Sequence, residues 1–172
     1  MAAMSLNRAI GFKEKLPWGS LPADWAYLYE VTKDKPMIMG RKSYEAEERV
    51  SSSAGNIVLS RQANYGLEDG FMQAESLEKA LEILRGLAHK EVFIIGGEQI
   101  FRQAIPQLVD RIYLTLVHEN FEGDAFFPEF APSVFLLKSR QDFKADAENR
   151  YDYSFLVYEK SLIEATLRTE KD

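Results

Sequence analysis

Residues 91–101 read EVFIIGGEQIF, and this stretch decides the fold class. Its apolar run at 92–95 predicts a central, buried strand, and a helix is expected to begin at about Glu98. Between the two, Gly96 and Gly97 allow a tight turn and a close approach of the backbone to a ligand. This order of elements exposes backbone N–H groups to a pyrophosphate, although a glycine pair at a strand end is often only a turn.

Two other predicted strands end in a comparable way. The apolar triplet 37–39 runs into GRKS at 40–43, with a helix expected over 44–49, and the apolar run 56–59 runs into SR at 60–61. Ligands of open α/β sheets bind at the carboxyl ends of the strands, so the glycines, hydroxyls and cations predict an anion site there. The alternative for residues 40–43 is a solvated helix start, although cations oppose the helix dipole at that position.

The whole pattern indicates an α/β fold: a single domain with a central, mostly parallel sheet, an antiparallel C-terminal hairpin strand and helices on both faces. Further strands are expected over 1–6, 71–72, 111–117, 134–139 and 151–160, and further helices over 22–32 and 76–87. Ser76 is predicted to cap the helix over 76–87. The apolar stripe of that helix is predicted to pack in the core. Residues 1–160 are expected to form the domain, and 161–172 a charged tail.

One carboxylate, Asp24, is predicted to lie in the first turn of the helix over 22–32. Pro22 suits the first helical position, and Trp25, Leu28 and Val31 give the apolar spacing. A carboxylate among apolar residues recognises a planar pair of N–H groups, because its two oxygens accept two parallel hydrogen bonds. The alternative is an ordinary first-turn acid that complements the helix dipole.

Composition limits the classes of function. The net charge of −6 over 172 residues argues against a general nucleic-acid or membrane-surface binder. There is no cysteine, and His89 and His118 lack the spacing of metal ligands, so we expect no metal site. With no long apolar run and no signal-like start, we expect a cytoplasmic monomer that binds a small molecule.

Motifs along nearly the whole chain resemble the dihydrofolate reductase family. They are AIG (9–11), LPW (16–18), LPAD (21–24), MGRKSYE (39–45), NIVLS (56–60), IIGG (94–97), YLT (113–115), EGD (122–124) and FP (127–128). The resemblance implies that fold, NADPH as the cofactor, and hydride transfer to pterin C6. The product would be the tetrahydro form of 7,8-dihydrofolate or of a related dihydropterin.

The resemblance also implies roles at the substrate. Asp24 would bind the 2-amino and N3 edge of the pterin and promote protonation of N5, while Thr115 hydrogen-bonds that carboxylate and Trp18 holds a water. Backbone carbonyls near Ala2 and Ile95 would meet the pterin amino group, and Leu28 would line the substrate pocket. The loop over 10–18, which contains Leu16, would close over the nicotinamide and exclude water.

Cofactor residues follow from the same resemblance. Those assigned to NADPH are Ala3, Met4, Ile10, Gly40, Arg41, Lys42, Ser43, Ser60, Arg61, Ile95, Gly96, Gly97, Glu98 and Gln99. The backbone of Ala3 and Met4 would meet the nicotinamide amide, and the cations and hydroxyls would hold the phosphates. Cations, and not an acid, are expected at the adenosine ribose, which favours a 2′-phosphate over a free hydroxyl.

The sequence departs from the family at the folate tail. The arginine that clamps the glutamate carboxylate is replaced by Ala54, and Glu47 and Ser51 stand where the family has aliphatic residues. Losing such a clamp weakens binding by about 1.5–3 kcal/mol, so we predict an unusually high KM for dihydrofolate. The first strand also begins about three residues late relative to the family, and a weakened sheet edge is expected.

Three alternatives stay open. The substrate could be a dihydropterin without the aminobenzoyl-glutamate tail. The chain could instead be the related reductase of riboflavin synthesis, although Asp24 and Trp18 argue against a site with no pterin edge to bind. A non-catalytic protein that binds NADPH or a pterin is the third.

Overall fold

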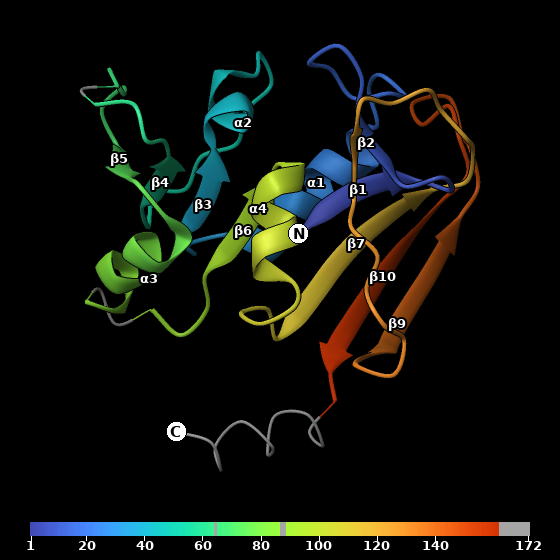
Figure 1. The fold of residues 1–172 in the computed structure, drawn as a ribbon. Coiled ribbons are helices and arrows are strands. Elements are labelled where there is room, and N and C mark those ends of the chain that lie inside the picture. Colours follow the sequence, from blue (N-terminus) through green and yellow to red (C-terminus); the bar gives the residue numbers. More distant parts are fainter. Residues whose placement is uncertain (64, 87–88, 162–172) are drawn as a thin grey trace. The chain divides into compact units, whose positions relative to one another are not determined.

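The computed structural model describes residues 1–63, 65–86 and 89–161 (Figure 1). The chain forms two compact units, each made of segments that are separate in the sequence. The first unit comprises Met1 and residues 23–101, and the second comprises residues 2–22 together with the chain from 102 onward.

A four-stranded parallel sheet forms the centre of the first unit. Its strands are β3 (Met37–Gly40), β4 (Asn56–Leu59), β5 (Phe71–Ala74) and β6 (Phe93–Gly96), in the order β5-β4-β3-β6. The register pairs Gly40 with Leu59 and Met39 with Gly96, so β3, β4 and β6 end at one edge of the sheet. The sequence prediction that these three carboxyl ends share an edge is therefore confirmed.

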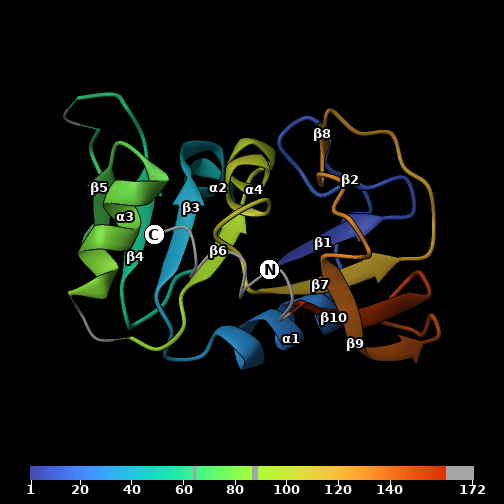
Figure 2. The same ribbon diagram turned by 60° about the horizontal axis from the view of Figure 1, so that its bottom comes forward.

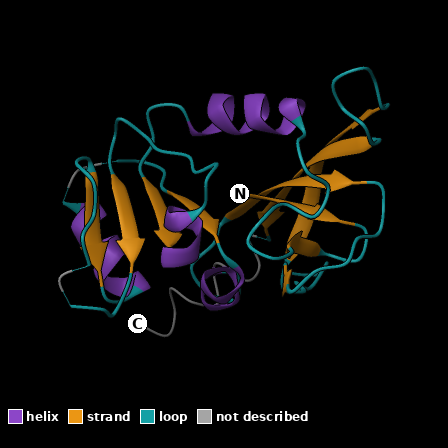
Figure 3. Cartoon of the chain, turned by 90° about the horizontal axis from the view of Figure 1, so that it is seen from above, coloured by secondary structure: helices purple, strands orange, loops and turns teal. Residues whose placement is uncertain are grey.

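The helices of the described residues flank this sheet on both sides (Figures 2 and 3). They are α1 (Pro22–Thr32), α2 (Arg41–Glu45), α3 (Leu77–Arg85) and α4 (Glu98–Ala104). In α3 the Ser76 hydroxyl caps the first turn by accepting from the backbone N–H of Lys79, and Leu77, Ala80 and Leu84 are buried. Burial of this stripe fixes α3 against β4 and β5.

The second unit contains the C-terminal strands. Its main sheet has the order β1-β7-β10-β9, made of β1 (Ala2–Ser5), β7 (Arg111–Val117), β10 (Tyr153–Lys160) and β9 (Phe135–Phe143). β1 runs parallel to β7, whereas β10 is antiparallel to both of its neighbours. A two-stranded sheet joins β2 (Ala9–Gly11) to β8 (Ala125–Phe126). The predicted α/β class and the antiparallel C-terminal hairpin are confirmed.

Three local predictions need correction or fall outside the described chain. The helix expected over 44–49 is α2, which begins at Arg41 and ends at Glu45, because Ala46 has extended backbone and Arg49 turns back onto the Tyr44 ring. β6 is an outer strand of its hydrogen-bonded sheet and not a central one, and Ile94 and Ile95 are half-buried. Residues 87–88, at the expected end of α3, and residues 162–172 of the expected tail lie outside the described residues.

Candidate active site

Backbone atoms converge where β3 and β6 end. A Cβ added at Gly40 would lie 3.5 Å from the Gly96 carbonyl oxygen and 3.6 Å from the Gly97 nitrogen. Gly96 has φ +127°, a conformation that L side chains rarely adopt, and its peptide bond to Gly97 is cis. The Ser43 hydroxyl lies 3.7 Å from the Cβ position of either glycine. Close backbone strands and a hydroxyl form a cradle that fits a pyrophosphate.

Cationic and hydroxyl side chains continue along the same sheet edge. Arg41 and Lys42, on α2, are exposed, as is Arg61, which follows β4. Ser60 is held in place because its carbonyl accepts a hydrogen bond of 2.9 Å from the Gln73 amide, and its N–H donates to Ala74. These groups supply positive charge and donors for phosphate oxygens.

An acid also lies on this edge, which the sequence reading did not anticipate. Nη1 of Arg41 donates to both carboxylate oxygens of Glu45 at 3.0 Å, and the Tyr65 hydroxyl donates to Glu45 Oε1 at 2.5 Å. The Tyr65 bond, followed by the guanidinium of Arg41, lowers the pKa of Glu45. Burial, followed by the bond to Glu45, raises the pKa of Tyr65 to about 12. The expected set of cations at this sheet edge is therefore incomplete, because it leaves out the carboxylate of Glu45.

Asp24 is the buried acid of the first unit. It lies in the first turn of α1, and its residue is only 9% exposed. The helix begins at Pro22, which has no N–H to lose in the first turn, and the bounds agree with the predicted 22–32. Burial of Asp24 disfavours the alternative of a solvated first-turn acid. Leu28, on the same helix, is half-buried.

The second unit brings together other predicted residues. Parallel pairing of β1 with β7 sets Ala2 opposite Leu114, Ala3 opposite Thr115 and Met4 opposite Leu116. Thr115 is 0% exposed, and its hydroxyl has no hydrogen-bond partner among the described residues. The indole N–H of Trp18 is likewise buried without a partner in the described part of the chain. Buried polar groups are normally satisfied, so these two point to a ligand or a water.

Hydrogen bonds hold the first part of the segment over 10–18 in place. Ile10 lies in β2, and residues 12 to 15 form a tight turn in which Phe12 and Lys15 exchange backbone hydrogen bonds. The Asp124 carboxylate accepts from the N–H of Lys13 at 2.9 Å, and the Asp124 N–H donates to the Gly11 carbonyl at 2.9 Å. Farther along, the Leu16 carbonyl accepts from the Gly19 N–H. The Trp18 ring packs edge-on against Phe121, with centroids 6.0 Å apart.

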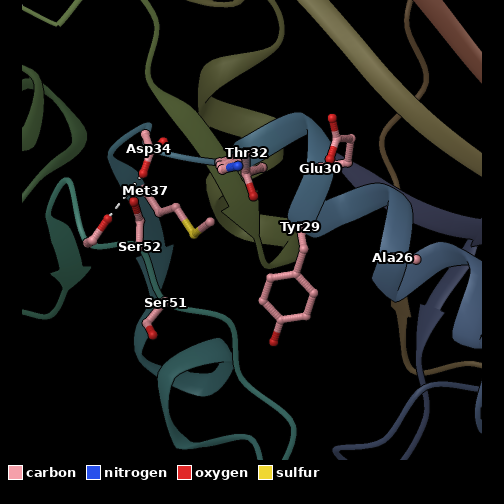
Figure 4. A pocket seen from close by; sticks show the side chains of 10 residues that line it. Ala26, Tyr29, Glu30, Thr32, Asp34, Met37, Ser51 and Ser52 are labelled. Carbon is pink, nitrogen blue, oxygen red and sulfur yellow. Dashed lines mark hydrogen bonds between the residues drawn. The ribbon is translucent and has the colours of Figure 1, made fainter.

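A pocket of about 360 Å³ lies between the second half of α1 and the serine-rich loop that follows α2 (Figure 4). It is lined by Ala26, Tyr29, Glu30, Thr32, Lys33, Asp34, Met37, Ser51, Ser52 and Ser53. Five of these side chains carry hydroxyls, two are carboxylates, and one is an ammonium group. Such a lining does not favour an anionic ligand, because its formal charge is negative.

The predicted residues thus fall into two groups, each within one unit. Those of the first unit are Asp24, Leu28, Gly40, Arg41, Lys42, Ser43, Ser60, Arg61, Ile95, Gly96, Gly97, Glu98 and Gln99, and those of the second are Ala2, Ala3, Met4, Ile10, Leu16, Trp18 and Thr115. Sequence reasoning missed Glu45 and Tyr65. The i,i+4 spacing of Arg41 and Glu45 was a usable signal for their pair, provided that the helix begins at Arg41.

The described part of the chain shows neither a cluster of potential metal ligands nor a membrane-spanning helix. Within the described ranges, no three His, Asp or Glu side chains gather as potential metal ligands. The helices of the described residues are all too short or too polar to cross a bilayer.

A parallel sheet whose strand ends carry a glycine cradle, hydroxyls and cations defines an α/β protein of the nucleotide-binding class. The family model for dihydrofolate reductase matches residues 1–160. The dihydrofolate reductase of Bacillus subtilis is 40% identical over 158 residues, which cover 92% of this chain and 91% of that protein. That of Haemophilus influenzae is 38% identical over 157 residues, covering 91% and 94%.

Solved structures agree with the sequence comparisons. A dihydrofolate reductase from Enterococcus faecalis, complexed with NADP(H) and RAB-propyl, superimposes with a TM-score of 0.79 at 32% identity. The match covers 93% of this chain and 94% of that one. The chain belongs to the dihydrofolate reductase family.

Proposed function

We propose that the protein catalyses the NADPH-dependent reduction of 7,8-dihydrofolate, or of a related dihydropterin, to the tetrahydro form. The observation that carries this proposal is the one buried carboxylate among the described residues, Asp24, which lies in the same unit as the glycine cradle and the cations of the β3, β4 and β6 edge. The family is one of oxidoreductases, and the relative from Enterococcus faecalis was solved with NADP(H).

The chain's own residues bind the cofactor and orient it. Gly96 and Gly97 let the backbone approach the pyrophosphate, while Arg41, Lys42, Ser43, Ser60 and Arg61 hold the phosphates. Ala3 and Met4, in β1, offer backbone groups to the nicotinamide amide. When bound, NADPH supplies the hydride that pterin C6 receives.

At the substrate, Asp24 orients the pterin and helps to deliver a proton. Its two oxygens accept hydrogen bonds from the 2-amino group and N3, which fixes the ring and promotes protonation of N5. The buried hydroxyl of Thr115 and the buried indole N–H of Trp18 have no hydrogen-bond partners among the described residues. Each group can therefore bind a ligand or a water. The loop over 10–18 excludes water from the reacting atoms, since water would weaken the electrostatic interactions there.

The tail of the substrate is held weakly. Ala54 stands in place of the expected arginine clamp, and Glu47 is exposed. The hydroxyl-rich pocket supports this view, because Ser51 lines it together with Glu30, Lys33 and Asp34. One ammonium group beside two carboxylates gives little net attraction for the two carboxylates of a glutamate tail. Dihydropterins without that tail are therefore the second candidate substrates.

The test is NADPH oxidation measured side by side with dihydrofolate, with its pteroyl analogue lacking the glutamate, and with tail-less dihydropterins. We expect turnover of dihydrofolate with a KM higher than is usual for the family, and a small change in KM when the glutamate is removed. A low KM for dihydrofolate would show that other residues bind its glutamate tail. Binding of NADPH without turnover of any dihydropterin would instead favour a non-catalytic binding protein.

Further properties belong to the same proposal. Residues 1–160 would act as one functional domain, and the partners would be small molecules, with no nucleic acid or membrane. We expect a monomer, which sedimentation equilibrium measures directly, and a cytoplasmic location, where NADPH and dihydropterins are available. The riboflavin-pathway alternative is disfavoured because its substrate offers no pterin edge to Asp24.

A further inference from the structure

The turn at 60–62, which follows β4, carries a hydroxyl and a cation next to each other in the chain. The N–H of Gln62 donates to Ser60 Oγ at 3.3 Å, and the Ser60 N–H donates to the Ala74 carbonyl at 3.0 Å. Because its oxygen accepts from Gln62, the Ser60 hydroxyl can turn its proton toward a phosphate oxygen. Arg61, between these two residues, is exposed. The turn thus offers two donors to an anion.

Gln73, on the neighbouring strand β5, holds this turn in place. Its Nε2 donates to the Ser60 carbonyl at 2.9 Å and to the Gln62 carbonyl at 2.8 Å. Both acceptors are carbonyl oxygens, so the nitrogen of the amide must face them, and both of its N–H groups are used. The two carbonyls belong to the residues on either side of Arg61. One half-buried side chain therefore fixes the backbone before and after the cation.

The alternation of side chains along β5 explains why Gln73 points toward this part of the site. Successive side chains of a strand point to opposite faces, so Phe71 and Gln73 lie on the same face of β5. The Phe71 ring packs edge-on against Tyr44 of α2, with centroids 5.0 Å apart. Gln73 therefore lies on the face of β5 toward α2, the helix that carries Arg41 and Lys42.

A turn that is already ordered binds an anion more tightly than a flexible one. Immobilising a loop or a long side chain during binding costs free energy, and hydrogen bonds formed beforehand remove part of that cost. The cradle at Gly96 and Gly97 fits a pyrophosphate, whereas a guanidinium beside the adenosine ribose suits a 2′-phosphate. The order that Gln73 imposes should therefore act on this second phosphate.

We propose that Gln73 is a positioning residue for the cofactor: it holds the turn at 60–62 so that the Ser60 hydroxyl and the Arg61 guanidinium meet the 2′-phosphate of NADPH. Gln73 acts through these two residues and makes no contact of its own with the cofactor. The inference rests on the proposed function, in which Ser60 and Arg61 hold a cofactor phosphate.

The test is equilibrium binding of NADPH, followed by quenching of tryptophan fluorescence, in the parent protein and in Gln73→Met. Methionine is also unbranched and removes both N–H donors. We expect NADPH to bind about three- to tenfold more weakly, because ordering of the turn then takes place during binding. NADH, used as a probe that lacks the 2′-phosphate, should change by less than about twofold for the same reason. In steady-state assays the KM for NADPH should rise and kcat should stay unchanged.

Met72→Gln is the matched control, because it exchanges the same two side chains at the neighbouring position. Met72 is 39% exposed and points to the opposite face of β5. Its replacement should leave both dissociation constants unchanged. Equal weakening of NADPH and NADH in Gln73→Met, or unchanged binding of NADPH, would overturn the inference.

Gln73→Asn is a second variant, which keeps a polar amide at this position in case Gln73→Met does not fold. Its side chain is one methylene shorter and cannot reach both carbonyls, so NADPH should again weaken more than NADH, by a smaller factor than in Gln73→Met. Unchanged binding of NADPH in this variant would also count against the role of Gln73.

Arg61→Ala separates this inference from the proposed function. We expect it to weaken NADPH more than NADH. In the Arg61→Ala background, Gln73→Met should weaken NADPH by no more than about twofold, because two residues that act through one contact are not additive. Full additivity would refute the inference. If Arg61→Ala alone leaves NADPH binding unchanged, the proposed phosphate site at this turn is wrong. If Arg61→Ala weakens NADPH while Gln73→Met has no effect, the phosphate site stands and only the role of Gln73 is refuted.

Discussion

Restoring a cation at position 54 should strengthen dihydrofolate binding. Ala54 is half-buried and follows the three serines that line the pocket beside α1. Its loop is already ordered: the Ala54 N–H donates to Ser52 Oγ at 3.0 Å, and the Asn56 amide donates to the Ser52 carbonyl at 2.8 Å. A side chain introduced here therefore starts from a fixed backbone, which lowers the entropic cost of placing a guanidinium.

The size of the effect follows from two opposing contributions. A charge-assisted, two-pronged contact to a carboxylate contributes about 1.5–3 kcal/mol. Glu30 and Asp34, in the same pocket, compete for the new cation as partly exposed ion pairs worth up to about 1 kcal/mol. The difference leaves about 0.5–2 kcal/mol, so Ala54→Arg should lower the KM for dihydrofolate roughly two- to thirtyfold.

Steady-state NADPH oxidation measures this effect, with dihydrofolate and a tail-less dihydropterin as paired substrates. Ala54→Met is the control, because it adds length without charge and should leave both KM values within about twofold. Only the KM for dihydrofolate should fall in Ala54→Arg. An unchanged KM, or an equal fall for the tail-less substrate, would refute the placement of the glutamate tail near this loop.

Two further predictions concern buried or hydrogen-bonded hydroxyls. Thr115→Val removes a buried hydroxyl that has no partner within the described chain, so the free energy of unfolding should rise by about 1 kcal/mol while turnover of dihydropterin falls; denaturant titration that shows a loss of stability would contradict this. In the ultraviolet titration of the eight tyrosines, one should ionise at about pH 12, and this step should disappear in Tyr65→Phe. Because the folded state raises this pKa, Tyr65 contributes stability below the ordinary tyrosine pKa that is lost as the pH rises toward 12. Glu45→Gln should return the Tyr65 step toward its ordinary value, and a step that stays at about pH 12 in that variant would show that burial alone holds it there.

Local patterns predicted the elements that carry the site. Pro22 and the apolar spacing after it place α1 correctly, and the strands over 56–59 and 111–117 have the bounds expected from their apolar runs. Parallel pairing of β3 with β4 and β6 then follows from the short apolar strands separated by helical segments. These features depend on side-chain periodicity, which the sequence displays directly.

Long-range contacts explain what the sequence did not predict. Residues 46–49 have helix-forming composition, but Arg49 packs on Tyr44 and Phe71 and pairs with Glu68, and these contacts outweigh helix propensity. Glu45 was missed as part of the cofactor edge for the same reason, because Tyr65 reaches it from another segment. The roles assigned to Trp18 and Thr115 came from the family resemblance alone. A buried indole N–H without a partner is what a water-holding role for Trp18 requires. The Thr115 hydroxyl has no partner among the described residues, so its hydrogen bond to the Asp24 carboxylate is not seen and stays a prediction.

The central claim is that Asp24 acts on the pterin and not on the fold or the cofactor. Asp24→Asn keeps the shape of the side chain but removes its charge and one acceptor oxygen. We predict that kcat/KM for dihydrofolate falls by roughly 10²–10⁴-fold, the usual contribution of a positioned acid or base. The dissociation constant of NADPH should stay within about twofold. Equal losses of turnover and NADPH affinity would contradict the account, because they would make Asp24 a structural residue.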